Sequence, residues 1–161
     1  MIRAATMADC EAIGRIYNHY VQSTAVTFEE QAIPSAQIAE RIEAVHSASL
    51  PWLIAEQDGQ VLGYAYASKW IGRSGYRFTV ESTVYLDPSV TGRGVGSILY
   101  DALLSSVRQR GAHVVIAAIA LPNPASVALH EKFGFEKVAH FSEIGFKFDR
   151  WVDIGYWERT L

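Results

Sequence analysis

The residues that most clearly suggest a chemical role form a glycine-rich turn. This turn lies between a strand-like segment and an amphipathic segment. Its sequence is Thr-Gly-Arg-Gly-Val-Gly-Ser, from Thr91 to Ser97. The start of a helix presents unpaired backbone N–H groups and the positive end of the helix dipole. Glycines let an anion come close to those groups, and Arg93 adds a positive charge. The turn therefore predicts a site for a phosphate or pyrophosphate, although a plain glycine-rich loop has the same composition.

Two common phosphate-binding turns fit this segment poorly. A Walker A loop needs Lys and then Ser or Thr after its last glycine, whereas Gly96 is followed by Ser97 and Ile98. A dinucleotide-binding turn needs Gly-x-Gly-x-x-Gly in a parallel β-α-β unit, and Gly92, Gly94 and Ser97 meet that pattern only in part. The strand before the turn also lies in a hairpin-rich region. We therefore expect a different kind of phosphate site.

The elements that must position this turn follow from the hydrophobic periodicity. Strand patterns cover 2–5, 51–56, 61–68, 78–86 and 114–121, and two more lie within 135–157 with a turn near 145–150. Helical patterns follow Thr6 and Pro34, open again between Gly92 and Gly96, and cover 126–133. This order predicts an α/β fold with a mixed, mostly antiparallel sheet of about seven strands flanked by about four helices.

Length and composition favour one domain over residues 1–161. Half of the residues are hydrophobic and 19% are charged, which is typical of a globular chain and not of a disordered one. The formal charge of −3 without a basic stripe argues against nucleic acid as a partner. The single cysteine, Cys10, cannot form an internal disulfide, and no apolar run has the length of a membrane span or a signal peptide. We expect a soluble, cytoplasmic protein without a metal site, because no His, Cys and carboxylate cluster has metal-ligand spacing.

Two signatures at the right separation make the chain resemble the GCN5-related N-acetyltransferase superfamily. That family holds the pyrophosphate of coenzyme A with the amides of an Arg/Gln-x-x-Gly-x-Gly/Ala motif. The segment from Thr91 to Gly96 has both closing glycines but carries Thr91 at the first position. The second signature is an Asn after the next strand and a helix that ends near Gly-Phe, here Asn123 to Phe135.

A closer resemblance, to the phosphinothricin and methionine sulfoximine acetyltransferases, covers most of the chain from Trp52 onward. It rests on the strings FTVESTVYL, TGRGVGSILY, LPNPASVALHEKFGF and GFKFDRWVDIGYW. The resemblance implies acetyl-CoA as co-substrate, the α-amine of a small amino acid analogue as acceptor, and a homodimer. It also implies coenzyme contacts from a strand, the turn and one Asn, at Val84, Tyr85, Leu86, Arg93, Gly94, Val95, Gly96, Ser97 and Asn123. The strand backbone would polarise the thioester carbonyl, and Asn123 could equally serve only as a turn residue.

The resemblance assigns catalytic roles to Glu81 and His130. An amine must be neutral to attack a thioester, and Glu81 matches the proposed base of the subfamily. A solvent-facing strand carboxylate is the alternative, although Glu is depleted in strand interiors. His130 stands where many family members carry a Tyr that protonates the departing thiolate, and imidazole can do this work near neutral pH. Tyr100 is an alternative acid or a packing residue, and His130 could also be an ordinary helix histidine.

The loop 69–77 supplies the predicted acceptor contacts. By resemblance, Arg73 and Tyr76 hold the acidic end of the substrate, because Arg suits a carboxylate or phosphinate. A Lys that is common two places before this Arg is Ile71 here, and the loop charge could also be merely solvated. Phe28 would wall the pocket or anchor its own loop. Lys147 and the neighbouring matches Trp151 and Asp153 would serve the C-terminal hairpin or a dimer contact.

The resulting hypothesis is direct acetyl transfer from acetyl-CoA to a small amino acid-like amine in a ternary complex. Cys10 lies far from the motifs, which argues against a covalent acyl-enzyme. Two alternatives stay open: an N-acetyltransferase for a protein N-terminus or a polyamine, and a non-catalytic acyl-CoA sensor. A panel of amines would separate the first, and tight coenzyme binding without turnover would indicate the second.

Overall fold

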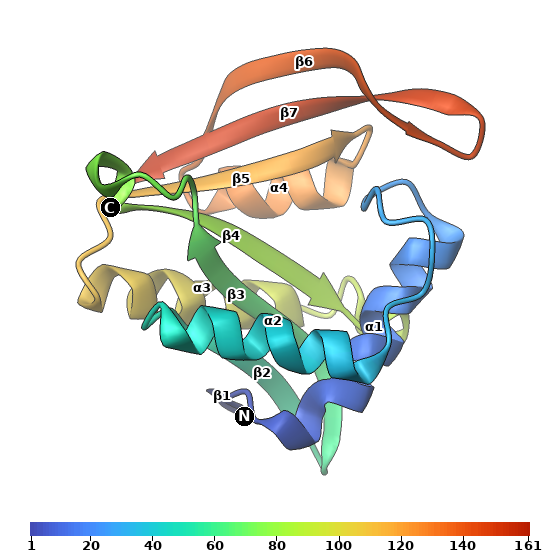
Figure 1. The fold of residues 1–161 in the computed structure, drawn as a ribbon, viewed down its shortest axis with the longest axis vertical. Helices are drawn as coiled ribbons and strands as arrows, with labels where there is room; N and C mark the ends of the chain where they lie inside the picture. The colour runs from blue at the N-terminus through green and yellow to red at the C-terminus, as the bar shows by residue number, and fades with distance from the viewer.

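A computed structural model describes residues 1–161 and shows one seven-stranded sheet with four helices (Figure 1). The strand order is β1-β2-β3-β4-β5-β7-β6, and all neighbours are antiparallel except β4 and β5. The strands are β1 (Ile2–Ala4), β2 (Trp52–Gln57), β3 (Gln60–Lys69), β4 (Thr79–Leu86), β5 (Val114–Leu121), β6 (Glu136–Lys147) and β7 (Arg150–Thr160). The mixed, mostly antiparallel α/β sheet predicted from the sequence is thereby confirmed.

The four helices cover both faces of the sheet. They are α1 (Cys10–Ser23), α2 (Ser35–Ser47), α3 (Val95–Gln109) and α4 (Pro124–Lys132). Helices α1 and α2 pack against the aromatic face of β2 and β3, where Trp52 and Tyr64 are almost fully buried. Helix α3 buries Leu99, Leu103 and other apolar side chains on the opposite face, against β3, β4 and β5. None of the four helices is both long and apolar enough to cross a membrane.

The local signals in the sequence place most element boundaries. Thr6 and Asp9 form a capping box, and Asp9 Oδ2 accepts hydrogen bonds from Thr6 N–H and Thr6 Oγ1. Asp58 and Gly59 form the tight turn between β2 and β3, both with positive φ. Helix α4 begins at Pro124, two residues before the predicted start, because the side chain of Asn123 caps it.

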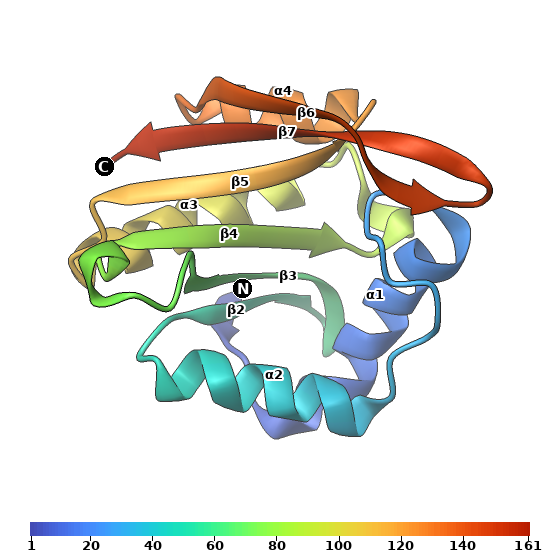
Figure 2. The same ribbon diagram turned by 45° about the horizontal axis from the view of Figure 1, so that its top comes forward.

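The sheet opens between β4 and β5. These two strands pair only from Thr79 to Glu81 with Val114 to Ile116, although both strands continue for several residues beyond this ladder. Figure 2 shows β4 and β5 separating toward the carboxyl end of β4, where α1 and the start of α3 lie. The backbone of residues 82–86 is therefore paired with β3 on one side and has no strand partner on the other. The opening creates the place where a ligand can enter the sheet.

The last two strands form a long hairpin that projects at one end of the molecule (Figure 1). The pairing of β6 with β7 shifts register between Phe141 and Gly145, which is a bulge in β6. Asp153 holds this bulge, because its carboxylate accepts the Glu143 N–H and contacts Nε2 of His140. A bulge bends its strand, and the end of β6 beyond it lies against the loop between α1 and α2.

Candidate active site

A cavity of about 840 Å³ lies in the opening between β4 and β5. Its walls come from the second half of β4, the end of β5, the glycine-rich turn before α3, and helix α4. Residues of the loop between α1 and α2 close one side of it. The predicted site residues that line it are Glu81, Val84, Tyr85, Leu86, Gly94, Gly96, Ser97, Asn123 and His130. The structure thus gathers residues from five separate segments around one space.

The glycine-rich turn forms the wall of this cavity at the start of α3. Gly94 is the residue before the helix and has φ of 83°. This left-handed conformation favours glycine and presents the first N–H groups of α3 at the cavity. Lys132, at the end of α4, donates a hydrogen bond from Nζ to Ser97 Oγ at 3.0 Å. Helix N–H groups beside an ammonium group suit a pyrophosphate, so the residues present fit the phosphate portion of coenzyme A.

Asn123 both caps α4 and lines the cavity. Its Oδ1 accepts the Ser126 N–H at 3.2 Å, which satisfies one of the unpaired donors of the helix. Its side-chain NH₂ group has no protein partner and remains able to donate to a ligand. The two roles that the sequence left as alternatives, a turn residue and a ligand contact, are therefore compatible in one side chain.

Glu81 is half-buried near the start of β4, two residues beyond Thr79. Burial raises the pKa of its carboxyl group above the ordinary value. Tyr156 on β7 lies close enough for Glu81 to raise its pKa further, after the larger effect of burial. A desolvated carboxylate with a raised pKa is a stronger base than an exposed one. The environment of Glu81 is therefore suited to proton abstraction.

His130 lines the cavity from α4 and is 4% exposed. Its Nδ1 lies 2.7 Å from the backbone oxygen of Ser126, one turn earlier in the helix. A carbonyl oxygen only accepts, so Nδ1 carries the hydrogen and the neutral ring keeps its lone pair on Nε2. Burial lowers the pKa of His130, and the bond to Ser126 partly opposes this. The imidazole is consequently neutral near pH 7, with Nε2 as a proton acceptor.

Tyr100 is completely buried and does not line the cavity. Its hydroxyl is 2.8 Å from Ser82 Oγ, and its ring packs edge-on against His130 and Phe133. Burial raises the pKa of this phenol well above its ordinary value, and the hydrogen bond with Ser82 opposes that effect. Of the two candidate acids, His130 faces the cavity directly, whereas Tyr100 reaches it only through Ser82.

Five predicted site residues lie outside the cavity wall. Arg93 is exposed in the turn, and Val95 packs into the core at the start of α3. Phe28 lies beside the cavity-lining Thr27 but packs against Gly145 on β6. Arg73 and Tyr76 are exposed in the loop before β4. None of these five residues forms the surface of the cavity.

Sequence reasoning missed several residues of the cavity wall. Tyr20 on α1 lines it and donates a hydrogen bond to the Leu86 oxygen at 2.7 Å. Val26 and Thr27 come from the loop between α1 and α2, and Lys132 comes from the end of α4. Only Lys132 had a local signal, since it lies two residues after His130 at the same helix end. The others reach the cavity through tertiary contacts with β4.

No group of three or more His, Cys, Asp or Glu side chains is arranged to hold a metal ion. Cys10 is buried in the first turn of α1, and burial raises the pKa of its thiol. The polar groups that line the cavity are the Glu81 carboxylate, the His130 imidazole, the Asn123 amide, the Lys132 ammonium, hydroxyls and backbone groups.

Comparison with known proteins gives the same picture over the whole chain. The sequence model of the acetyltransferase (GNAT) domain matches residues 2–155. The phosphinothricin N-acetyltransferase of Streptomyces viridochromogenes is 40% identical over 160 residues, covering 99% of this chain and 87% of that protein. The L-methionine sulfoximine/L-methionine sulfone acetyltransferase of Salmonella typhimurium is 38% identical, with 99% and 94% covered. A solved acetyltransferase from Salmonella typhimurium, with its cofactor acetyl-CoA, superposes with a TM-score of 0.97 at 37% identity, covering 100% of this chain and 93% of that one.

Proposed function

The chain belongs to the GNAT family and is an acetyl-CoA-dependent N-acetyltransferase, and we propose that it acetylates the α-amine of a small amino acid analogue. Phosphinothricin, methionine sulfoximine and methionine sulfone are the proposed acceptors, as they are named for its relatives. The observation that carries this proposal is the shared cavity of Glu81 and His130. A partly desolvated carboxylate on β4 and a neutral imidazole on α4 line one cavity.

Glu81 is the proposed base for the acceptor amine. Amino acid amines are protonated near pH 7 and must lose a proton before they attack. The raised pKa of Glu81 reduces the difference between its pKa and that of the amine. Transfer of the proton to the Glu81 carboxylate, directly or through a water, therefore becomes easier. Bound acetyl-CoA supplies the activated acetyl group as a thioester. The attack is direct, and no covalent acyl-enzyme is formed at Cys10.

His130 is the proposed proton carrier on the coenzyme side. Its Nε2 has a free lone pair because Nδ1 donates to the Ser126 oxygen. The residue therefore has to gain a proton at Nε2 before it can give one to a departing thiolate. We assign it both steps: Nε2 takes the second proton of the amine, which the nitrogen gives up after its bond to the acetyl carbon forms, and then donates it to the coenzyme A thiolate as the C–S bond breaks. Tyr100 supports the ring through an edge-on contact and does not carry the proton.

The coenzyme contacts are proposed to come from backbone groups and one side-chain amide. Val84, Tyr85 and Leu86 belong to the half of β4 whose backbone has no partner toward β5. A backbone N–H there can stabilise the oxyanion of the transition state. The turn with Arg93, Gly94, Val95, Gly96 and Ser97 is proposed for the pyrophosphate. The unpaired NH₂ of Asn123 is proposed for the pantetheine portion.

Arg73, Tyr76 and Phe28 are the proposed acceptor contacts. The loop that carries the first two begins beside Trp70, which packs edge-on against Tyr156, the neighbour of Glu81. An exposed Arg can bind the carboxylate or phosphinate of an acceptor in a bidentate manner, and we propose this role for Arg73. Phe28 supports the cavity wall from behind Thr27.

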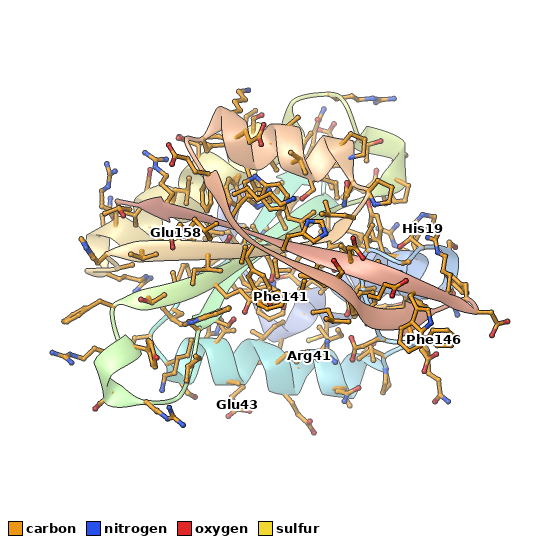
Figure 3. All side chains as sticks on the ribbon, turned by 90° about the horizontal axis from the view of Figure 1, so that it is seen from above. His19, Arg41, Glu43, Phe141, Phe146 and Glu158 are labelled. Atoms are coloured by element: carbon orange, nitrogen blue, oxygen red, sulfur yellow. The ribbon has the colours of Figure 1, made fainter.

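We further propose a cytoplasmic homodimer. The hairpin exposes several large apolar side chains: Phe141, Ile144, Phe146, Phe148 and Trp151. Figure 3 shows Phe146 near the free end of the hairpin and Phe141 closer to its middle. Exposed apolar side chains on an outer strand favour association, and a second copy is the proposed occupant. Light scattering of the wild type and of Phe146→Glu tests this, and a monomeric wild type would contradict it.

The test of the proposed function is thiol release from acetyl-CoA with a panel of amines. The panel contains methionine sulfoximine, phosphinothricin, methionine sulfone, ordinary amino acids, a polyamine and an N-terminal peptide. Fast release with the first three supports the proposal. Release only with the peptide or the polyamine would overturn the acceptor class, and coenzyme binding without any release would indicate a sensor.

A further inference from the structure

The free end of the β6–β7 hairpin has two distinct sides. Beyond the bulge in β6, Phe146 and Phe148 are exposed, whereas Gly145 and Lys147 are buried. The two exposed residues are therefore both aromatic, whereas the two buried residues are a glycine and a lysine. A lysine that is 2% exposed needs a specific explanation, since lysines are almost never fully buried unless their ammonium is paired. The proposed reaction gives this lysine no role.

The ammonium group of Lys147 joins two parts of the chain that are far away in sequence. Nζ donates one hydrogen bond to the Val21 oxygen at 2.6 Å and one to the Thr27 oxygen at 2.8 Å. Val21 lies in the last turn of α1, where backbone oxygens lack helical partners and the dipole favours a cation. Burial lowers the pKa of Lys147, and the nearby carboxylates of Glu30 and Glu29 oppose this.

A second contact reinforces the first at the neighbouring inward position of β6. A Cβ atom added to Gly145 would lie 2.2 Å from Cζ of Phe28, so the ring sits directly on the backbone of β6. Only glycine permits this approach. Lys147 and Gly145 therefore hold two consecutive loop residues, Thr27 and Phe28, against the hairpin.

The held segment is a wall of the active-site cavity. It belongs to the α1–α2 loop (residues 24–34), whose Val26 and Thr27 line the cavity beside β4. The hydroxyl of Thr27 is also 2.7 Å from the hydroxyl of Tyr17 on α1. Tyr17 in turn donates to Glu29, which pairs with Arg41 on α2. The α1–α2 loop is thus fixed from the helices on one side and from the hairpin on the other.

We propose that Lys147 is a positioning residue for acceptor binding, because it holds the α1–α2 loop against the hairpin and so sets the cavity wall at Thr27. This inference rests on the proposed acetyl transfer to a small amine. Lys147 does not touch the reacting atoms and acts through the backbone of the loop. The glycine-rich turn is built from other segments, so the coenzyme end of the cavity does not depend on Lys147.

The test compares Lys147→Met with Lys147→Arg and with Lys137→Met. Methionine keeps most of the side-chain volume and removes the donors, arginine keeps a cation that can donate, and Lys137 is an exposed lysine on the same strand. For Lys147→Met, we expect the amine KM to rise about tenfold or more while the acetyl-CoA KM changes less than about twofold. Lys147→Arg should recover part of the loss, and Lys137→Met should behave as the wild type.

Hydrogen exchange provides a readout that does not need turnover. Amides of residues 24–34 should exchange faster in Lys147→Met, whereas those of residues 91–99 should not. If the wild type acetylates no amine, the proposed function fails, and exchange still tests the contact itself. Lower kcat with both KM values unchanged, or equal exchange in the two segments, would overturn the positioning role. Should Lys147→Met not fold, Lys147→Arg carries the test at smaller amplitude: residues 24–34 should exchange faster than in the wild type, and residues 91–99 should not.

Discussion

The two ends of the cavity are built in different ways. The proposed coenzyme end comes from short contiguous segments, namely the turn 91–97 and the start and end of α4. The glycines, the helix-capping Asn123 and His130 each line the cavity from their own short segment and do not depend on contacts with distant parts of the chain. The acceptor end depends on contacts such as those of Lys147 with Val21 and Thr27, which are separated by 126 and 120 residues.

This difference has a functional meaning. A phosphate group can be bound by backbone amides at a helix start. A local motif is therefore enough to bind the pyrophosphate of acetyl-CoA, which is the same whatever amine is acetylated. An acceptor wall made of loop segments can change when any of its distant supports changes. We therefore expect variants at the two ends to separate cleanly into effects on acetyl-CoA and effects on the amine.

The largest expected effect belongs to Glu81, the proposed base. Glu81→Gln should lower kcat/KM for the amine by about 10²- to 10⁴-fold, because it removes the base and keeps the shape. The Kd of acetyl-CoA, measured by calorimetry, should stay within about twofold. Glu158→Gln, at an exposed position of β7, is the matched control. Loss of coenzyme binding in Glu81→Gln would remove Glu81 from the role of base.

The pH dependence is the second test of the same residue. The carboxylate of Glu81 must be ionised to act, and burial raises its pKa, so kcat/KM should rise with pH through that raised value. Below the pKa each pH unit should cost about tenfold in rate. Burial lowers the pKa of His130, which places the protonation of His130 below its ordinary range. An acid limb that persists in Glu81→Gln and disappears in His130→Gln would reverse the assignment.

Gly145→Ala should act on the acceptor end alone. The added methyl group would collide with the ring of Phe28 and move the α1–α2 loop. We expect a rise of about tenfold in the amine KM with an unchanged acetyl-CoA KM. Gly14→Ala, whose added Cβ would meet only Ile38 at 3.7 Å, serves as control. In a background with Phe28→Ala, Gly145→Ala should have little further effect, and full additivity would contradict the contact.

Gly94→Ala should act on the coenzyme end alone. Its φ of 83° disfavours alanine, so the turn must adjust before the helix amides can hold a phosphate. We expect the Kd of acetyl-CoA to weaken by about three- to tenfold, measured by calorimetry, with little change in the amine KM. Gly59→Ala has a similar backbone conformation in a distant turn. Gly59→Ala should lower the stability of the fold without raising the Kd of acetyl-CoA. An equal loss of acetyl-CoA affinity in both variants would point to a global effect.

The smallest effect on activity is expected for Asp87, whose substitution should change the stability of the fold instead. Hydrogen bonds from Ser89 and Arg15 lower the pKa of Asp87 to about 2. This group therefore stabilises the fold above the unfolded-state pKa and loses that contribution as the pH falls toward 2. Asp87→Asn should reduce the free energy of unfolding by roughly 2 kcal/mol at pH 7, measured in urea, and the difference should shrink toward pH 2. A difference that persists at low pH would mean that geometry and not charge is responsible.

The sequence predicted the fold well, and it predicted the glycine-rich turn at a helix start and the position of Asn123, because these depend on local regularities. Periodicity gave every strand and helix in the right order, and Gly94 and Asn123 stand where their backbone or capping role requires them. The acceptor end was less accessible, since Lys147 bonds to backbone oxygens, which every residue possesses. The choice between His130 and Tyr100 also needed the structure, because only packing directs one of them to the cavity.

The separation of β4 from β5 also has a consequence for the solubility of the protein. A ligand that uses backbone hydrogen bonds requires unpaired strand groups, and such groups on an outer strand invite other chains to add to the sheet. Here the unpaired backbone of residues 82–86 lies in the interior of the sheet, between two strands of the same chain. A slender ligand can enter there, whereas an added polypeptide strand would have to fit between β4 and β5, which stay paired at Thr79–Glu81. The unpaired backbone groups of residues 82–86 can therefore bind a ligand, while strands of other molecules cannot readily pair with them.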